Sequence, residues 1–239
     1  MNRIVNMEKS MYHLFARYYD QIFDFNPQIF EPLFKRQYRN ACDIGCGTGR
    51  LTKVIHDHNI NSLGIDLDRD MIEIALRKYP NIEFKVLNML NISDLQSFDL
   101  ITCFGNTIPH ITPLEFNQFF KSIQEKLADE GVFWIQLLNY NRIIEDKITE
   151  LQPIIKSDFK FYRNYVFRDH YIEFHTHIET EDESKRGVTN LYPYQMHDFI
   201  KLQDTHHLQV SCYGSLDEKP FDLNKDYYLY VKVQKKGSS

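Results

Sequence analysis

The sequence has few cysteines and lacks the patterns that mark disulfide-rich, secreted or membrane proteins. Four of its 239 residues are cysteine, and no two of them form a Cys-x-x-Cys pair. We therefore expect reduced, buried thiols in a cytoplasmic protein. No apolar run approaches the roughly 20 residues that a membrane span needs, and we do not expect the start of the chain to act as a signal peptide.

Runs of lysine and arginine are also lacking. The formal net charge is -5 and the isoelectric point is near 6.1. Proteins that bind nucleic acid or a membrane surface usually carry a basic patch, so we expect a small-molecule partner, no nucleic acid and no membrane. A chain of this length with 43% hydrophobic residues can bury a sizeable core. It predicts one α/β domain, with two small domains as the alternative, and leaves monomer and homodimer open.

What the sequence does contain is a glycine loop over residues 40–50. An apolar run ends in Asp43, three glycines follow at Gly45, Gly47 and Gly49, and a helical pattern begins within the loop. Glycine lets a ligand approach the backbone, and the N–H groups of a helix start favour negative ligand groups. The dinucleotide fingerprint is Gly-x-Gly-x-x-Gly, and here the third glycine falls one residue too early for it. The stretch predicts a strand, a ligand-binding loop and a helix.

The Asp-x-Gly-x-Gly-x-Gly spacing resembles the first motif of the class I S-adenosylmethionine-dependent methyltransferases. In that family the loop cradles the methionine part of the cofactor, and a carboxylate at the end of the next strand accepts both ribose hydroxyls. Asp66 stands where that second carboxylate is expected. The resemblance implies S-adenosylmethionine as cofactor, S-adenosylhomocysteine as product, and transfer of a methyl group to an N or O atom of a small-molecule acceptor.

Strand and helix patterns alternate from residue 39 onward. Strands are expected at 39–44, 62–65, 82–87, 98–104 and 132–138, with helices between them. Such alternation predicts parallel βαβ units, whose ligands bind beyond the carboxyl ends of the strands. The resemblance extends this to a Rossmann-like α/β fold: a seven-stranded, mostly parallel sheet with helices on both faces and its last strand antiparallel.

We expect one methyltransferase domain with four parts. These are an N-terminal helical lid (1–27), a cofactor-binding core (38–139), a substrate-side β insertion (155–192), and a C-terminal helix and β hairpin (193–236). The lid is predicted from apolar side chains at helical spacing, and many small-molecule methyltransferases begin with a similar segment that folds over the cofactor.

The insertion begins where the alternation stops. Residues 159–166 and 171–178 predict a hairpin, 187–192 a third strand, and together a small antiparallel sheet near the mouth of the site. His175 and His177 share one face of this sheet. No cysteine or carboxylate stands at a spacing that would complete a metal site with them, so we predict no metal.

Arginines on the same hairpin carry a second possibility. Arg163 and Arg168, with Tyr162, can hold a substrate carboxylate or phosphate through forked hydrogen bonds, or can simply be solvated. The residues alone do not choose between these roles.

A second motif covers residues 98–110. Its Gly-Asn-Thr and Pro-His elements resemble the Gly-Asn-Ser-x-x-His segment of methyltransferases akin to glycine and sarcosine N-methyltransferases. The Asn-Pro-Pro-Tyr tetrapeptide of DNA and amine-on-base methyltransferases is absent, which again argues against a nucleic-acid substrate. Two roles fit His110: it can be a catalytic base, or a histidine at the start of a helix whose side chain bonds to the backbone.

The resemblance also assigns the individual site residues. Those expected to act on the acceptor are His110, Tyr19 and Tyr140. Those expected to hold the cofactor are Tyr12, Asp43, Gly45, Cys46, Gly47, Asp66, Leu67, Met71, Asn88, Met89, Phe104, Gly105 and Asn106. Asn88 replaces an acid that the family often has at the adenine, and its carbonyl oxygen can still accept a hydrogen bond.

Three other interpretations stay open. A nicotinamide or flavin oxidoreductase would share the sheet, although the glycine spacing and Asp43 oppose it. A non-catalytic S-adenosylmethionine-binding protein, such as a sensor or an inactive subunit, would keep the cofactor motifs, and a methylated product would distinguish it from an enzyme. A protein or RNA methyltransferase is disfavoured by the negative charge.

Overall fold

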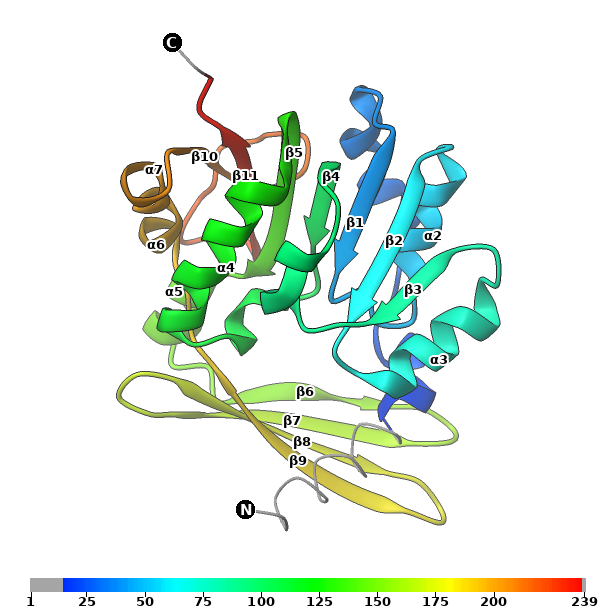
Figure 1. Cartoon of the computed structure of the whole chain (residues 1–239). Coiled ribbons are helices and arrows are strands. Elements are labelled where there is room, and N and C mark those ends of the chain that lie inside the picture. The colour runs from blue at the N-terminus through cyan, green and yellow to red at the C-terminus, as the bar shows by residue number, and fades with distance from the viewer. Residues whose placement is uncertain (1–14, 238–239) are drawn as a thin grey trace.

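The computed structural model describes residues 15–237 and forms two β-sheets with helices around the larger one (Figure 1). The strands of the main sheet are β1 (Asn40–Ile44), β2 (Asn61–Asp66), β3 (Glu83–Val86), β4 (Phe98–Cys103), β5 (Leu127–Leu138), β10 (Leu208–Tyr213) and β11 (Tyr228–Lys235). The strands of the second sheet are β6 (Glu150–Ile155), β7 (Lys160–Phe167), β8 (Ile172–Glu179) and β9 (Ser184–Leu191).

Helices occupy the connections between strands. They are η1 (Pro27–Lys35), α2 (Arg50–Asp57), α3 (Arg69–Lys78), η2 (Met89–Asp94), η3 (Ile108–His110), α4 (Pro113–Lys126), α5 (Tyr140–Glu145), α6 (Met196–Ile200) and α7 (Leu202–Thr205). Residues 15–22 are also helical and are called the N-terminal helix below. No helix within residues 15–237 is long and apolar enough to cross a membrane.

The main sheet has the strand order β10-β11-β5-β4-β1-β2-β3. Strands β1 to β5 run parallel to one another, and β11 is antiparallel to both of its neighbours, β5 and β10. This confirms the predicted fold, including the antiparallel last strand. The carboxyl ends of the parallel strands meet at one edge, which faces the second sheet (Figure 1).

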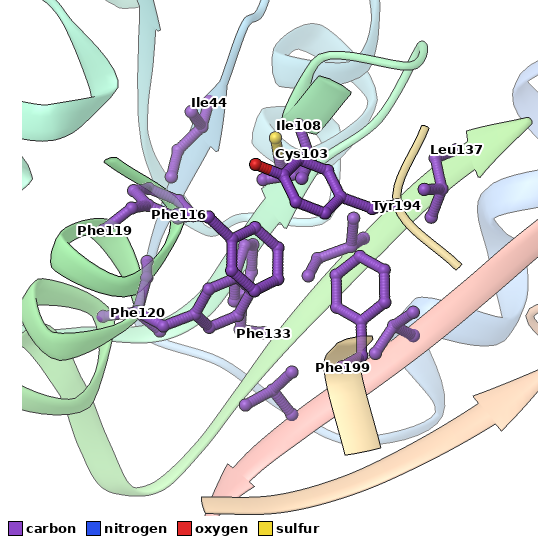
Figure 2. Packing of buried hydrophobic residues seen from close by; sticks show 14 of the residues in the cluster. Ile44, Cys103, Ile108, Phe116, Phe119, Phe120, Phe133, Leu137, Tyr194 and Phe199 are labelled. Carbon is purple, nitrogen blue, oxygen red and sulfur yellow. The ribbon is translucent and has the colours of Figure 1, made fainter. Parts of the chain in front are cut away.

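The sheet is buried on both faces, as parallel sheets are when helices cover them. The larger core lies on the α4 side, where Phe116 and Phe120 pack against Phe133 of β5 and Phe199 of α6 (Figure 2). η1, α2 and α3 bury smaller apolar clusters against the sheet. These two layers hold the strand ends, and so the site, in place.

The second sheet has four strands rather than the three expected. β7 and β8 form the predicted hairpin, displaced by one residue, and β9 begins earlier than expected. The missed strand is β6, which contains Pro153. A proline within a sequence argues against a strand, because it has no backbone N–H to donate. β6 is an edge strand, however, where the missing N–H is tolerated. The predicted C-terminal helix is divided into α6 and α7 by a turn at Lys201.

Candidate active site

Asp43 is the last residue but one of β1, and its side chain is bonded to the first turn of α2. Its buried carboxylate accepts hydrogen bonds of 2.7 Å from the Thr52 hydroxyl and 2.8 Å from the Thr102 hydroxyl. Burial raises the pKa of Asp43 to about 6, although the hydroxyls and the Thr52 backbone N–H lower it. Asp43 thus bonds one residue in the first turn of α2, whose N-cap is Gly49, and ties the loop to the helix. The cofactor role expected of Asp43 and of this helix start stays a prediction.

The N–H groups of the glycine loop are bonded to the end of β2. Gly45 and Cys46 both donate to the carbonyl oxygen of Ile65, at 2.8 and 3.0 Å. The N–H of Gly47 donates to Oδ2 of Asp66 at 2.8 Å. The loop is thus fastened to the neighbouring strand, and its shape is set before any ligand arrives.

Asp66 and Leu67 present an acceptor and an apolar surface side by side. The other carboxylate oxygen of Asp66 accepts the N–H of Asp68 at 2.9 Å, and the backbone N–H of Leu67 also bonds this carboxylate, which is half-buried. Burial is the main cause that raises the pKa of Asp66. Leu67 is 70% exposed. A ligand with a diol and a flat apolar ring fits this pair.

Three further predicted cofactor residues contribute to the local structure. Asn88 accepts the N–H of Leu90 at 3.0 Å and caps η2. Met89 packs against the larger core, and Met71 is buried in the first turn of α3. Their contact with an adenine ring stays a prediction.

Gly105 and Asn106 form a left-handed turn after β4. The N–H of Gly105 donates to the Gln136 side chain at 2.8 Å, and a Cβ on Gly105 would meet no described atom within 4 Å. The Asn106 side chain donates to the Tyr140 hydroxyl at 2.9 Å and accepts the Leu138 N–H at 3.1 Å. The backbone of Gly105 is therefore rigidly held and open on one side.

Two predicted site residues lie elsewhere than expected. Tyr140 is 1% exposed, and burial raises the pKa of its hydroxyl far above its ordinary value. This corrects its expected place beside the acceptor, because it packs in the core and supports Asn106. Phe104 stacks on Phe30 with ring centroids 5.7 Å apart and meets Tyr230 edge to face. Its ring belongs to the apolar cluster beside η1.

His110 ends η3 as an exposed side chain. Its imidazole makes no hydrogen bond to another described residue. Desolvation by the surrounding protein lowers the pKa of His110, which favours the neutral form that can accept a proton. The carbonyl oxygen of Pro109 accepts the N–H of Tyr192 at 2.7 Å, which fastens η3 to the segment just after β9.

The N-terminal helix lies on the glycine loop. A Cβ on Gly47, where φ is 53°, would lie 3.5 Å from the Tyr19 ring. Burial raises the pKa of Tyr19 to about 12, and the Arg50 guanidinium lies 5.4 Å from the ring centroid. Tyr19 therefore lies at the glycine loop, where the sequence predicts it. Tyr12, which is also predicted to line the site, lies outside the described part of the chain.

Asp20 fastens this helix by polar bonds that the sequence did not predict. It accepts hydrogen bonds of 2.6 Å from Thr48 in the loop and 2.6 Å from Lys78 in α3, and pairs with Arg50 at 3.2 Å. Burial acts to raise the pKa of Asp20, but the bonds from Lys78 and Thr48 prevail and lower it. Asp20, Thr102 and Gln136 belong to no sequence motif, because their partners Thr48, Asp43 and Gly105 are distant in the sequence.

Two other features lie apart from this site. A cavity of about 350 Å³ is lined by Asn61, Glu83 and Phe98 at the amino ends of the strands, at the opposite end of the sheet from the glycine loop. His175 and His177 contact Glu173 and Ser184 in the second sheet. No group of three metal-binding side chains is found among residues 15–237.

Residues 41–131 match the family model of a methyltransferase domain. A putative methyltransferase of Geobacillus sp. (strain WCH70) is 30% identical over 135 residues, which cover 51% of this chain and 55% of that relative. The chain thus spans about half the length of this curated relative.

Two solved structures share the fold over nearly the whole chain. An S-adenosylmethionine-dependent methyltransferase from Clostridium acetobutylicum ATCC 824 has a TM-score of 0.81 at 19% identity, covering 95% of this chain and 99% of that one. A sugar N-methyltransferase from Streptoalloteichus sp. ATCC 53650 has a TM-score of 0.69 at 17% identity, covering 94% of this chain and 93% of that one. At these identities the likeness extends to the fold.

Proposed function

We propose that this chain is a class I S-adenosylmethionine-dependent methyltransferase and that it transfers a methyl group to a nitrogen or oxygen atom of a small-molecule acceptor. The observation that carries the proposal is the geometry at Asp66, whose carboxylate bonds the glycine loop and lies half-buried at the end of β2 beside the exposed Leu67. The sugar N-methyltransferase among the fold neighbours is consistent with a small acceptor.

The residues at the strand ends fit the cofactor of this family. Asp66 would accept the ribose hydroxyls, Leu67 and Met89 would cover the adenine, and Asn88 would meet its edge. The open side of Gly105 leaves room for the reacting end. S-adenosylmethionine, when bound, supplies a methyl group on a positively charged sulfur, ready for in-line displacement.

Positioning is the main task left to the protein, because displacement needs an aligned nucleophile about 3 Å from the methyl carbon and exclusion of water. The N-terminal helix would cover the loop through Tyr19 and Asp20, which excludes water from that side. The neutral imidazole of His110 would take the proton from a hydroxyl acceptor. An amine acceptor loses its proton more easily and needs His110 less.

The test is a screen with S-adenosylmethionine carrying a labelled methyl group, offered with small amines, amino acids, sugars and phenols. We expect label in at least one small product, and S-adenosylhomocysteine formed in equal amount. S-adenosylhomocysteine binding without any labelled product would contradict the proposed transfer and support a non-catalytic binding protein. Label found in RNA or protein, but in none of the small acceptors, would contradict the acceptor class.

A further inference from the structure

The N-terminal helix contacts two parts of the protein with two different faces. Tyr18 and Tyr19 are neighbours in the chain, and successive side chains of a helix point about 100° apart, so their rings face different surroundings. Tyr19 lies over Gly47 of the glycine loop, whereas the Tyr18 ring faces Phe159, the residue before β7. The helix therefore connects the glycine loop with the second sheet (Figure 1).

Polar groups hold the face of the helix that lies on the loop. The Asp20 carboxylate accepts hydrogen bonds of 2.6 Å from the Thr48 hydroxyl and 2.6 Å from Lys78 in α3. Just beyond the helix, the carbonyl oxygen of Phe23 accepts a hydrogen bond of 2.7 Å from the Arg50 guanidinium. Thr48 lies in the loop and Arg50 begins α2, so this face is fixed to the region expected to hold the cofactor.

The other face of the helix is apolar and packs on aromatic rings of the second sheet. The Tyr18 ring lies 4.8 Å from that of Phe159, and the Phe15 ring lies 5.6 Å from that of Phe161 in β7. Aromatic pairs attract one another at such distances. Ile22 lies on the same face of the helix as these two residues and is buried beside the rings of the sheet.

These side chains form a cluster that is separate from the larger core. Among residues 15–237 it contains only residues of segment 15–23 and of the second sheet with the residue before β7: Phe15, Tyr18, Ile22, Phe23, Ile154, Phe159, Phe161 and Ile178. At the other end of the second sheet, Tyr165, Ile172 and Leu191 pack in the larger core instead. One end of the sheet is therefore held by the larger core and the other by the N-terminal helix.

We infer that Phe159 and Phe161 are positioning residues for the cofactor site, which act by holding the N-terminal helix against the glycine loop. Most of the stability of a protein helix comes from the packing of its apolar face rather than from its own propensity. Without the contact with the second sheet, the helix would lie on the loop in a smaller fraction of the molecules, and the cofactor affinity would fall by that fraction. This inference rests on the proposed function for the identity of the ligand, but not for the contact between helix and sheet.

The coupling has a second consequence, which follows from thermodynamic linkage. A helix that favours cofactor binding when it lies on the loop must itself be favoured there by a bound cofactor, by the same factor. In that position the helix buries Phe159 and Ile178, so the strands β7 and β8 should be better protected against hydrogen exchange when the ligand is bound. A merely structural role of the aromatic rings would produce neither effect.

The first test is calorimetric titration of the full chain with S-adenosylhomocysteine. We expect Phe159→Ala to raise the Kd at least about tenfold, which corresponds to a helix that lies on the loop in about a tenth of the molecules. Phe159→Leu keeps an apolar side chain and should recover part of the affinity. Phe174→Ala is the matched control and should leave the Kd unchanged, because Phe174 of β8 packs on Tyr165 and the larger core.

Tyr18→Ala removes the same contact from the side of the helix, which separates the effect from misfolding of the sheet. Tyr18 is only half-buried, so its loss should leave the fold intact. Its Kd should rise as in Phe159→Ala, and the double variant should bind no more weakly than the weaker single variant, because both side chains act through one contact. Unchanged Kd values in both single variants, or fully additive losses in the double variant, would overturn the inference, even if the melting temperature falls.

Hydrogen exchange followed by mass spectrometry gives the second readout. Without ligand, residues 15–22 should exchange faster in Phe159→Ala than in the unaltered chain. S-adenosylhomocysteine should slow exchange in β7 and β8 of the unaltered chain, and much less in Phe159→Ala. Binding of the ligand without any response of β7 and β8 would overturn the inference while the proposed function stands. Failure of the unaltered chain to bind the ligand would reject the proposed function, and exchange of residues 15–22 without ligand would still test whether Phe159 holds the helix.

Discussion

The backbone N–H of Gly47 donates a 2.8 Å hydrogen bond to Oδ2 of Asp66, so the loop after β1 and the end of β2 form one unit. Asp66 therefore shapes the loop, and under the proposed function it would also bind the ligand through its remaining acceptor capacity. A substitution at this residue should affect binding more than global stability, since the loop is also held through Ile65.

Asp66→Ala should weaken the binding of S-adenosylhomocysteine by about 2–4 kcal/mol, because two hydrogen bonds from hydroxyls to a charged acceptor are lost. Calorimetric titration of the variant measures this, with Asp57→Ala as the control. Asp57 is a surface carboxylate paired with Lys53, away from the loop. An unchanged dissociation constant in Asp66→Ala would remove Asp66 from the cofactor site.

Asp43 should make the protein less stable as the pH rises from 4 to 7. Folding raises the pKa of Asp43 from 3.8 to about 6, so the native state favours the protonated carboxyl. Its stabilising contribution is complete below pH 3.8 and is lost as the pH passes through 6, a change on the order of 3 kcal/mol.

Asp43→Asn lacks this titration and provides the measurement. The free energy of unfolding of both proteins is measured with urea at pH 4, 5, 6 and 7. Between pH 4 and 6 the value for the variant, relative to that for the unaltered chain, should increase. A difference that stays constant with pH, or that shrinks, would contradict the raised pKa that burial gives Asp43.

Asp20→Asn should release the N-terminal helix from the glycine loop. The amide carries no charge for Lys78 and Arg50, so the backbone N–H groups of residues 15–22 should exchange hydrogen faster. Hydrogen exchange followed by mass spectrometry measures this, and the exposed Asp24→Asn is the matched control. Equal exchange in both variants would show that Asp20 does not hold the helix.

Tyr140→Phe should cost about 1–3 kcal/mol of unfolding free energy, because the Asn106 side chain loses its buried acceptor. The rate of methyl transfer by this variant should fall only to the extent that loss of the hydrogen bond loosens the turn at Asn106. Chemical unfolding together with the labelled-methyl assay separates the two effects. An unchanged free energy of unfolding together with complete loss of methyl transfer would indicate that Tyr140 contacts the reacting atoms.

His110→Ala should slow methyl transfer to a hydroxyl acceptor by about 10²- to 10⁴-fold and transfer to an amine far less. The pKa of His110 lies below its ordinary 6.5, so kcat/KM should rise with pH and level off below neutrality. The variant should lose this rise, whereas His197→Ala, on an exposed part of α6, should keep it. Full turnover of a hydroxyl acceptor by His110→Ala would exclude it as the base.

The sequence predicts the main sheet well because the signals there are local. Asp43 and the three glycines lie within a few residues, and the apolar runs of buried parallel strands are continuous. The edge strand β6 escaped prediction because Pro153 interrupts it, and only the pairing with β7 shows why proline is tolerated there.

The roles of the site residues depend on contacts that no local pattern carries. Asp43 and Asp66 look alike in the sequence, as acids at strand ends. The structure separates them by burial, because Asp43 is enclosed and bonded to Thr52 and Thr102, whereas Asp66 is half-buried at the end of β2 beside the exposed Leu67.

The most direct measurement is calorimetric titration of the purified protein with S-adenosylmethionine, S-adenosylhomocysteine and NAD. We expect micromolar binding of the first two, lost in Asp66→Ala, and no binding of NAD, because the glycine spacing and Asp43 do not match the dinucleotide fingerprint. Binding of NAD, or of none of the three, would contradict the assignment of the loop over residues 43–50 and of Asp66 as a cofactor site.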